Sequence, residues 1–331
     1  MLKMILEKYP EATDFHLTEN GPVMIRCKGL LTEGENIDGA LLEKEISDRL
    51  SPEKREEYKL IGVTDTSLEE GGVRVRVHLY KSGGKTCGAL RILPPLNKIN
   101  PDPDEPWIEE VSKLKTGLVL LSGPSGSGKS TTMARILQKI GDTRACHIVT
   151  LEDPVEYILQ SKTSLIHQRE VGEDVPTFAE GVKESLREDP DVIALGEMRD
   201  RETMAAALSA AETGHLVLAT LHNGEVKDAI GRIIHSFSGD EQSEARNILV
   251  RVLRMVSAQR LWQNGKKTVL LREILWNTPA VSHLIRQGRE EQMASYMEAG
   301  NKNMRTLRQA AYNVRKLTAS ERKELLEYIE R

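Results

Sequence analysis

One short segment, residues 123–131, restricts the fold of this chain more than any other. It reads GPSGSGKST and matches the phosphate-binding pattern GxxxxGK[ST], in which glycines let backbone N–H groups turn towards phosphate oxygens. An apolar run, LVLLS, precedes it, and a helical pattern follows from about Lys129. This strand–loop–helix context separates the segment from a chance glycine-rich match. It predicts a nucleotide site on an α/β sheet covered by helices.

We expect the side chains of this loop to bind ATP and Mg²⁺, the two predicted cofactors. We expect Lys129 to place its charge at the β- and γ-phosphates and the Ser130 hydroxyl to be a ligand of Mg²⁺. The other predicted nucleotide-binding residues are Gly123, Ser125, Gly126, Ser127, Gly128 and Thr131. The alternative is a degenerate loop that binds nucleotide without hydrolysis, and the intact Lys129 and Ser130 argue against it.

Acidic side chains follow two predicted strands at the point where each strand ends. The segments are LEDPVEY at 151–157 and GEMRD at 196–200, and the candidate carboxylates are Glu152, Asp153, Glu156 and Glu197. Ligands of open α/β sheets bind at the carboxyl ends of the strands. ATP hydrolysis there needs one carboxylate to orient or deprotonate water and another group to hold Mg²⁺. A solvated acidic loop is the alternative for the first segment.

A histidine and a glycine also lie at the ends of predicted strands. His222 follows the strand predicted at 216–220, where it could bind a γ-phosphate and report its loss, and a structural histidine is the alternative. A typical Walker B segment carries an acid just before Glu197, but this chain has Gly196 at that position.

The remaining pattern predicts two domains and a linker. The first, 1–96, is expected to be α+β with an antiparallel sheet, and residues 97–106 belong to a proline-rich linker that we expect to be neither helix nor central strand. The second, 107–331, alternates short apolar strands with helices, which predicts a mainly parallel sheet, and is helical from about 280. In the first domain we predict strands at 22–31 with a turn at Lys28-Gly29, helices over 41–60 with Ser51 as an N-cap, and strands at 73–79 and 87–93.

Composition disfavours other classes of protein. The net charge of −4 and an aromatic content of 4% give no basic or stacking surface for nucleic acid, so a nucleic-acid motor is disfavoured. The three cysteines are far apart, which argues against disulfides or a zinc site and makes the reducing cytoplasm the simplest compartment. No stretch approaches the roughly 20 apolar residues that span a bilayer, so we expect membrane association only through a partner.

With these motifs together, the chain resembles the type II/type IV secretion ATPases, and most closely the type IV pilus retraction ATPases. The matching stretches are the loop at 123–132, LEDPVEY, QREVG at 168–172, LREDPDVIALGEMRDRET at 186–203, AAETGHLVLATLH at 210–222, ATDFHL at 12–17, GPVMIR at 21–26 and AVSHLIRQ at 280–287. The Gly196-Glu197 pair is shared with the family. Asn223 replaces a usual threonine, and Ser282 and His283 replace an Arg-Asn pair. We expect hydrolysis to survive both departures, with the coupling to a partner less secure.

The resemblance implies a PAS-like N-terminal domain and a RecA-like P-loop NTPase domain with C-terminal helices. It implies a nucleotide between the two domains, with arginines of the first domain reaching it; Arg76 and Arg91 match these positions best. The alternative is that Arg74 and Arg76 form only the solvent face of a strand. Glu156 would be the leading catalytic carboxylate, assisted by Glu152 and Glu197.

The resemblance also implies a function: a homohexameric motor that hydrolyses ATP to power type IV pilus retraction and twitching motility. Such a motor would work at the cytoplasmic face of the inner membrane, held there by a pilus platform protein, without nucleic acid. Within the class, the alternative is a compact pilus-assembly or type II secretion ATPase. Outside it, the alternative is an ATP-binding scaffold that does no mechanical work.

Overall fold

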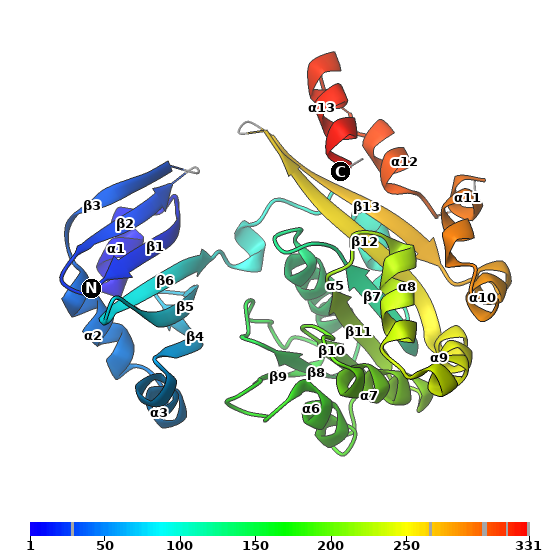
Figure 1. The fold of residues 1–331 in the computed structure, drawn as a ribbon, viewed down its shortest axis with the longest axis horizontal. Helices are drawn as coiled ribbons and strands as arrows, with labels where there is room; N and C mark the ends of the chain where they lie inside the picture. The colour runs from blue at the N-terminus through cyan, green and yellow to red at the C-terminus, as the bar shows by residue number, and fades with distance from the viewer. Residues whose placement is uncertain (28–29, 265–266, 300–302, 316, 330–331) are drawn as a thin grey trace. The chain divides into compact units, whose positions relative to one another are not determined.

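The computed structural model describes residues 1–27, 30–264, 267–299, 303–315 and 317–329, and divides into two compact units (Figure 1). The first unit is Met1–Asn100 with Pro154–Ile158, and the second is Pro101–Asp153 with Leu159–Arg331. The predicted turn at Lys28-Gly29 lies outside the described residues. Within them, no helix combines the length and apolar character needed to cross a bilayer.

The described part of the first unit combines an antiparallel sheet with helices. Among the described residues the strand order is β3-β2-β1-β6-β5-β4. The elements are α1 (Leu2–Lys8), β1 (Ala12–Thr18), β2 (Pro22–Cys27), β3 (Leu30–Asp38), α2 (Gly39–Asp48), α3 (Pro52–Ile61), β4 (Val63–Glu70), β5 (Val73–Ser82) and β6 (Lys85–Leu93). The predicted alternation in β5 is confirmed, since Val75, Val77 and Leu79 are fully buried. The predicted cap is also confirmed: the Ser51 side chain accepts a hydrogen bond from the Lys54 N–H, with Pro52 in the first turn.

The second unit is built on a sheet with the strand order β13-β12-β7-β11-β10-β8-β9 in the described part of the chain. All neighbours in this sheet are parallel except β13, which is antiparallel to β12. The strands are β7 (Gly117–Ser122), β8 (His147–Glu152), β9 (Leu165–Glu170), β10 (Val192–Leu195), β11 (Leu216–Leu221), β12 (Leu253–Gln263) and β13 (Thr268–Trp276). The mainly parallel sheet is thus confirmed.

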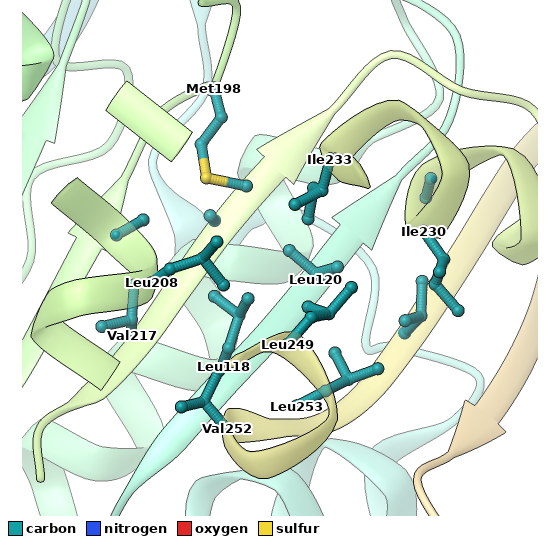
Figure 2. Close-up of a cluster of buried hydrophobic side chains, with 14 of the residues drawn as sticks. Leu118, Leu120, Met198, Leu208, Val217, Ile230, Ile233, Leu249, Val252 and Leu253 are labelled. Carbon is teal, nitrogen blue, oxygen red and sulfur yellow. The ribbon is translucent and has the colours of Figure 1, made fainter. Parts of the chain in front are cut away.

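Helices cover this sheet and bury its apolar strands. They are α4 (Glu105–Ser112), α5 (Lys129–Thr143), α6 (Phe178–Ser185), α7 (Arg201–Glu212), α8 (Val226–His235) and α9 (Gly239–Val252). Strands β7, β10 and β11 are buried at every residue, which is typical of parallel strands covered on both faces. Figure 2 shows the core where β7 meets α8 and α9; its members include Leu118, Leu120, Ile230, Ile233, Leu249 and Val252.

The chain ends in short helices, as predicted from about residue 280. They are α10 (Pro279–Arg286), η2 (Glu290–Gln292), α11 (Met293–Glu298), α12 (Leu307–Tyr312) and α13 (Ala319–Ile329). The last two pack on the β12–β13 hairpin through a small core that includes Trp262, Leu271, Leu307 and Leu325 (Figure 1).

The expectation that the proline-rich stretch excludes helix is wrong. Leu96–Lys98 forms a 3₁₀ turn, η1, and α4 begins at Glu105 with Pro106 in its first turn. Proline is tolerated there because the first N–H groups of a helix have no partner within the helix, so the missing donor costs nothing.

Candidate active site

The predicted functional segments of the second unit meet at one edge of its sheet. β7, β11, β10 and β8 are consecutive parallel neighbours. The last residues of β7 and β11, Ser122 and Leu221, are paired, and the last residue of β10, Leu195, pairs with Ala219 and Leu151 near the ends of β11 and β8. The phosphate loop, His222, Glu197 and Glu152 follow or form these strand ends. The structure therefore brings these sequence-predicted residues to the same edge, where α/β sheets bind ligands.

The phosphate loop has a backbone that only glycine allows. Gly123 has a φ of 145°, and a Cβ atom added there would lie 2.3 Å from the carbonyl oxygen of Gln259. The Lys129 ammonium donates hydrogen bonds to the carbonyl oxygens of Gly123, at 2.8 Å, and Pro124, at 3.1 Å. The Ser127 hydroxyl is buried inside the loop without a hydrogen-bond partner among the described residues. The loop thus combines a positive charge with the amides that begin α5, which are the groups that favour a bound phosphate.

The residues present fit a magnesium nucleotide. Ser130 lies in the first turn of α5, and carboxylates occupy the ends of neighbouring strands. The described residues contain no group of three or more His, Cys, Asp and Glu side chains that could hold a metal ion alone. Mg²⁺ is usually bound by one or two protein oxygens together with substrate phosphates, so this donor set suits Mg²⁺ bound with ATP.

Glu197 is held between two basic side chains. Its Oε2 lies 3.0 Å from His222 Nε2, and its Oε1 lies 2.6 Å from Arg199 Nη2. Only 8% of Glu197 is exposed, whereas the side chains of both partners are exposed. His222 is therefore a partner of the neighbouring strand's glutamate. Arg199 was not predicted, although it lies two residues after Glu197 in GEMRD, where a basic residue beside a buried acid is a usable signal.

The Glu152 carboxylate accepts hydrogen bonds from side chains of β8 and β9. Its Oε1 accepts hydrogen bonds from Thr150 Oγ1, at 2.7 Å, and Gln168 Nε2, at 3.0 Å. The Oε1 of Gln168 also accepts the N–H of Leu159, at 2.8 Å, so this side chain bonds both to Glu152, in the acidic segment, and to Leu159, two residues after that segment ends. In the sequence, Gln168 stands out only as part of QREVG, one of the stretches that resemble the family. The missing signal was β9, which was not predicted and which brings Gln168 beside β8.

The strand before the phosphate loop is joined to the segment after His222. Ser122 Oγ donates to the carbonyl oxygen of Asn223, at 2.7 Å, and accepts from the Asn223 N–H, at 3.1 Å. Both contacts use the backbone of Asn223. A change of side chain at this position, from the family's usual threonine, therefore leaves them in place.

The first unit carries the predicted arginines and Glu156. Arg76 and Arg91 face each other across β5 and β6. Arg91 Nε donates to Asp14 at 2.9 Å, and Arg76 lies 3.8 Å from Asp65, so each arginine has an acidic neighbour. Arg74 donates to the carbonyl oxygen of Val155 at 2.9 Å, next to Glu156 in the segment that belongs to this unit. The roles of Arg76, Arg91 and Glu156 at nucleotide stay predictions.

Comparisons with known proteins identify relatives of this chain. The family model for type II/IV secretion system proteins matches residues 96–329. The type IV pilus retraction ATPase PilT of Pseudomonas aeruginosa is 38% identical over 89% of this chain and 88% of its own length. The uncharacterised protein YggR of Escherichia coli K12 is 40% identical over 87% of this chain and 89% of its own. A crystal structure of the pilus retraction motor PilT with bound ADP is 37% identical, with a TM-score of 0.85 over 98% of this chain and 96% of that one.

A family-model match over most of the chain, a still broader match to PilT, and a matching fold lead to one assignment. The chain belongs to the type II/IV secretion system protein family and is a PilT-like secretion ATPase.

Proposed function

We propose that this chain is a motor that hydrolyses ATP to retract type IV pili, and so drives twitching motility. The observation that carries the proposal is the phosphate loop with Glu152, Glu197 and His222 on one sheet edge, in a chain that matches a pilus retraction ATPase along nearly its whole length. The proposal includes a homohexameric ring, held at the cytoplasmic face of the inner membrane by a platform protein of the pilus. It also includes a PAS-like first domain and a RecA-like second domain.

The proposed chemistry divides among the residues of the site. The loop amides and Lys129 hold the β- and γ-phosphates, and Ser130 holds Mg²⁺, which when bound offsets the phosphate charge. Glu156 is the leading carboxylate for the attacking water, and Glu152 and Glu197 assist at water and metal. His222, which already contacts Glu197 at 3.0 Å, is placed to transmit the loss of the γ-phosphate to that glutamate.

The proposed work comes from movement between the units. Arg76 and Arg91 close on the γ-phosphate, where charge develops during transfer, and phosphate release relaxes this closure. The segment around 97–106 absorbs the change. A ring of such subunits would pass it to the platform protein.

A type II secretion ATPase is the second candidate, and coverage argues against it. The type II secretion system protein E of Pseudomonas aeruginosa is 39% identical, but the match spans 51% of this chain and only 34% of that protein. The retraction ATPase of the same organism is matched over 88% of its length. A compact assembly ATPase remains the alternative that an experiment must separate.

Deletion of the gene in the organism that carries it separates retraction from assembly. Retraction predicts that surface pili accumulate and twitching stops, whereas loss of surface pili would support the assembly alternative. Complementation with Lys129→Ala should fail, and complementation with Lys113→Gln, a matched change at an exposed lysine of the same unit, should succeed. A normal phenotype with Lys129→Ala would contradict any ATP-driven role.

A further inference from the structure

A chain of buried polar side chains lies beneath the phosphate loop. Gln259 on β12 is fully buried, and its Nε2 donates to the carbonyl oxygen of Ser127, in the loop, at 2.7 Å. Its Oε1 accepts from Thr132 Oγ1, on α5, at 3.1 Å. The backbone of Gln259 is the surface that excludes a side chain at Gly123. One residue therefore supports the loop with both its backbone and its side chain.

This series of polar contacts continues through Arg272, the cross-strand partner of Gln259 on β13. Arg272 Nη2 donates to Thr132 Oγ1 at 3.0 Å. Both terminal nitrogens of Arg272 also bind Asp102, at 2.7 and 2.6 Å, in a bidentate pair in which each side chain is 1% exposed. The Arg272 guanidinium lies 4.5 Å from the centre of the Trp107 ring. The hydroxyl of Thr132 is thus the link between a loop-binding amide and a buried ion pair.

Asp102 lies where the chain passes from the first unit to the second. It is the second residue of the second unit, directly after the segment that leaves the first unit at Asn100. Arg135 of α5 lies 3.4 Å from the same carboxylate, and Asp102 accepts the N–H of Asp104 at 2.9 Å. Burying an ion pair is costly in desolvation, and apolar residues of similar size are often as stabilising, so stability alone is a weak reason for this arrangement.

We propose that Gln259, Thr132 and Arg272 are positioning residues that couple the shape of the phosphate loop to the connector between the units at Asp102. A nucleotide that fixes the loop then also fixes the start of the second unit, and a displacement of the connector weakens nucleotide binding. This deepens the proposed function and rests on it, because it assigns the route by which the phosphate site acts on the segment that joins the two units.

The test is a double-mutant cycle on nucleotide affinity in the full chain. Thr132→Val removes the linking hydroxyl with little change of shape, and Asp102→Asn weakens the ion pair without touching the loop. With ADP and Mg²⁺ as the probe in titration calorimetry, we expect each variant to weaken binding about three- to tenfold, the range of one lost hydrogen bond. The double variant should bind ADP as tightly as the single variant with the lower affinity, because both changes break the same route and their effects do not add. Thr132→Ser, which keeps the hydroxyl, should restore wild-type affinity.

Controls and a second measurement keep the outcomes distinct. Thr143→Val removes a hydroxyl that bonds the carbonyl oxygen of Lys139 at the end of the same helix, and should leave affinity unchanged. ADP should slow hydrogen exchange of the Asp104 amide in the wild type but not in Thr132→Val, provided that circular dichroism shows both are folded. If the wild type binds no nucleotide, the proposed function itself fails. If it binds and Asp102→Asn binds equally well, or the two effects multiply, the coupling proposed here is wrong.

Discussion

Glu273, on β13, gives a prediction about stability that follows directly from its surroundings. Burial is the largest effect and raises the pKa of Glu273 from 4.5 to about 7; the nearby Glu225 and Asp228 raise it further, while the Val226 N–H and Arg260 oppose the rise. The folded chain therefore keeps this proton between pH 4.5 and about 7, where the unfolded chain has lost it. Since the folded state binds more protons in this window, the free energy of unfolding falls as pH rises through it, and the loss is complete above about pH 7.

The magnitude follows from the difference between the two pKa values. At 1.36 kcal/mol per pH unit, Glu273 costs the folded state about 3 kcal/mol at pH 8.5 relative to pH 4. Glu273→Gln has nearly the same shape and keeps an oxygen to accept the Val226 N–H, now at 2.9 Å, but does not ionise. We expect the variant to match the wild type at pH 5 and to be more stable by about 2–3 kcal/mol at pH 8.5.

Urea unfolding of the second unit, followed by tryptophan fluorescence at pH 5, 7 and 8.5, measures this difference. Glu324→Gln, at an exposed position of α13, is the matched control and should keep the pH dependence of the wild type. Equal pH dependence of the wild type and Glu273→Gln would refute the reasoning, because the buried carboxyl would then not be the group that titrates.

Three further predictions concern the site. Gly123→Ala should abolish ADP binding in calorimetry, because the φ of 145° and the 2.3 Å approach of its Cβ to Gln259 require the loop to move; near-normal affinity would contradict the described loop. Glu197→Gln should slow ATP turnover about 10²- to 10⁴-fold in a phosphate-release assay while ADP affinity stays within about threefold, and unchanged turnover would remove Glu197 from the mechanism. Asn223→Thr should change the free energy of unfolding by less than about 0.5 kcal/mol in urea, since the contacts to Ser122 use only its backbone, and a larger loss would show that its side chain matters.

The sequence predicted the parts of the site whose chemistry is tied to a local pattern. The phosphate loop could be found because its glycines, lysine and serine act together within nine residues. The strands β7, β8, β10 and β11 could be found because parallel strands buried on both faces are short apolar runs. The expectation that their acidic residues lie at the ligand-binding edge rested on the rule that ligands of such sheets bind at the carboxyl ends of the strands.

The sequence could not predict the elements whose polar residues are satisfied by distant partners. β12 and β13 carry Gln259, Arg272 and Glu273 at buried positions, and these residues become acceptable in a core only through partners such as Asp102, 170 positions from Arg272. β9 was missed because its side chains are exposed or half-buried, so its apolar signal is weak. The proline-rich stretch was misjudged because Pro106 marks the start of a helix rather than its exclusion.

The packing of the sheet explains why a glycine precedes Glu197. A Cβ atom at Gly196 would lie 3.3 Å from both the Cα of Glu152 and the carbonyl oxygen of Leu151, which is closer than side chains normally approach a backbone. The Gly196 N–H also donates to that carbonyl at 2.8 Å, so the two strands cannot separate without losing this bond. An acidic side chain at this position would require the backbone of β8 to move by a few tenths of an ångström. The end of β8 already carries a carboxylate, Glu152, which is oriented by Thr150 and Gln168. The close approach between β8 and β10 therefore favours glycine over an acidic residue at position 196.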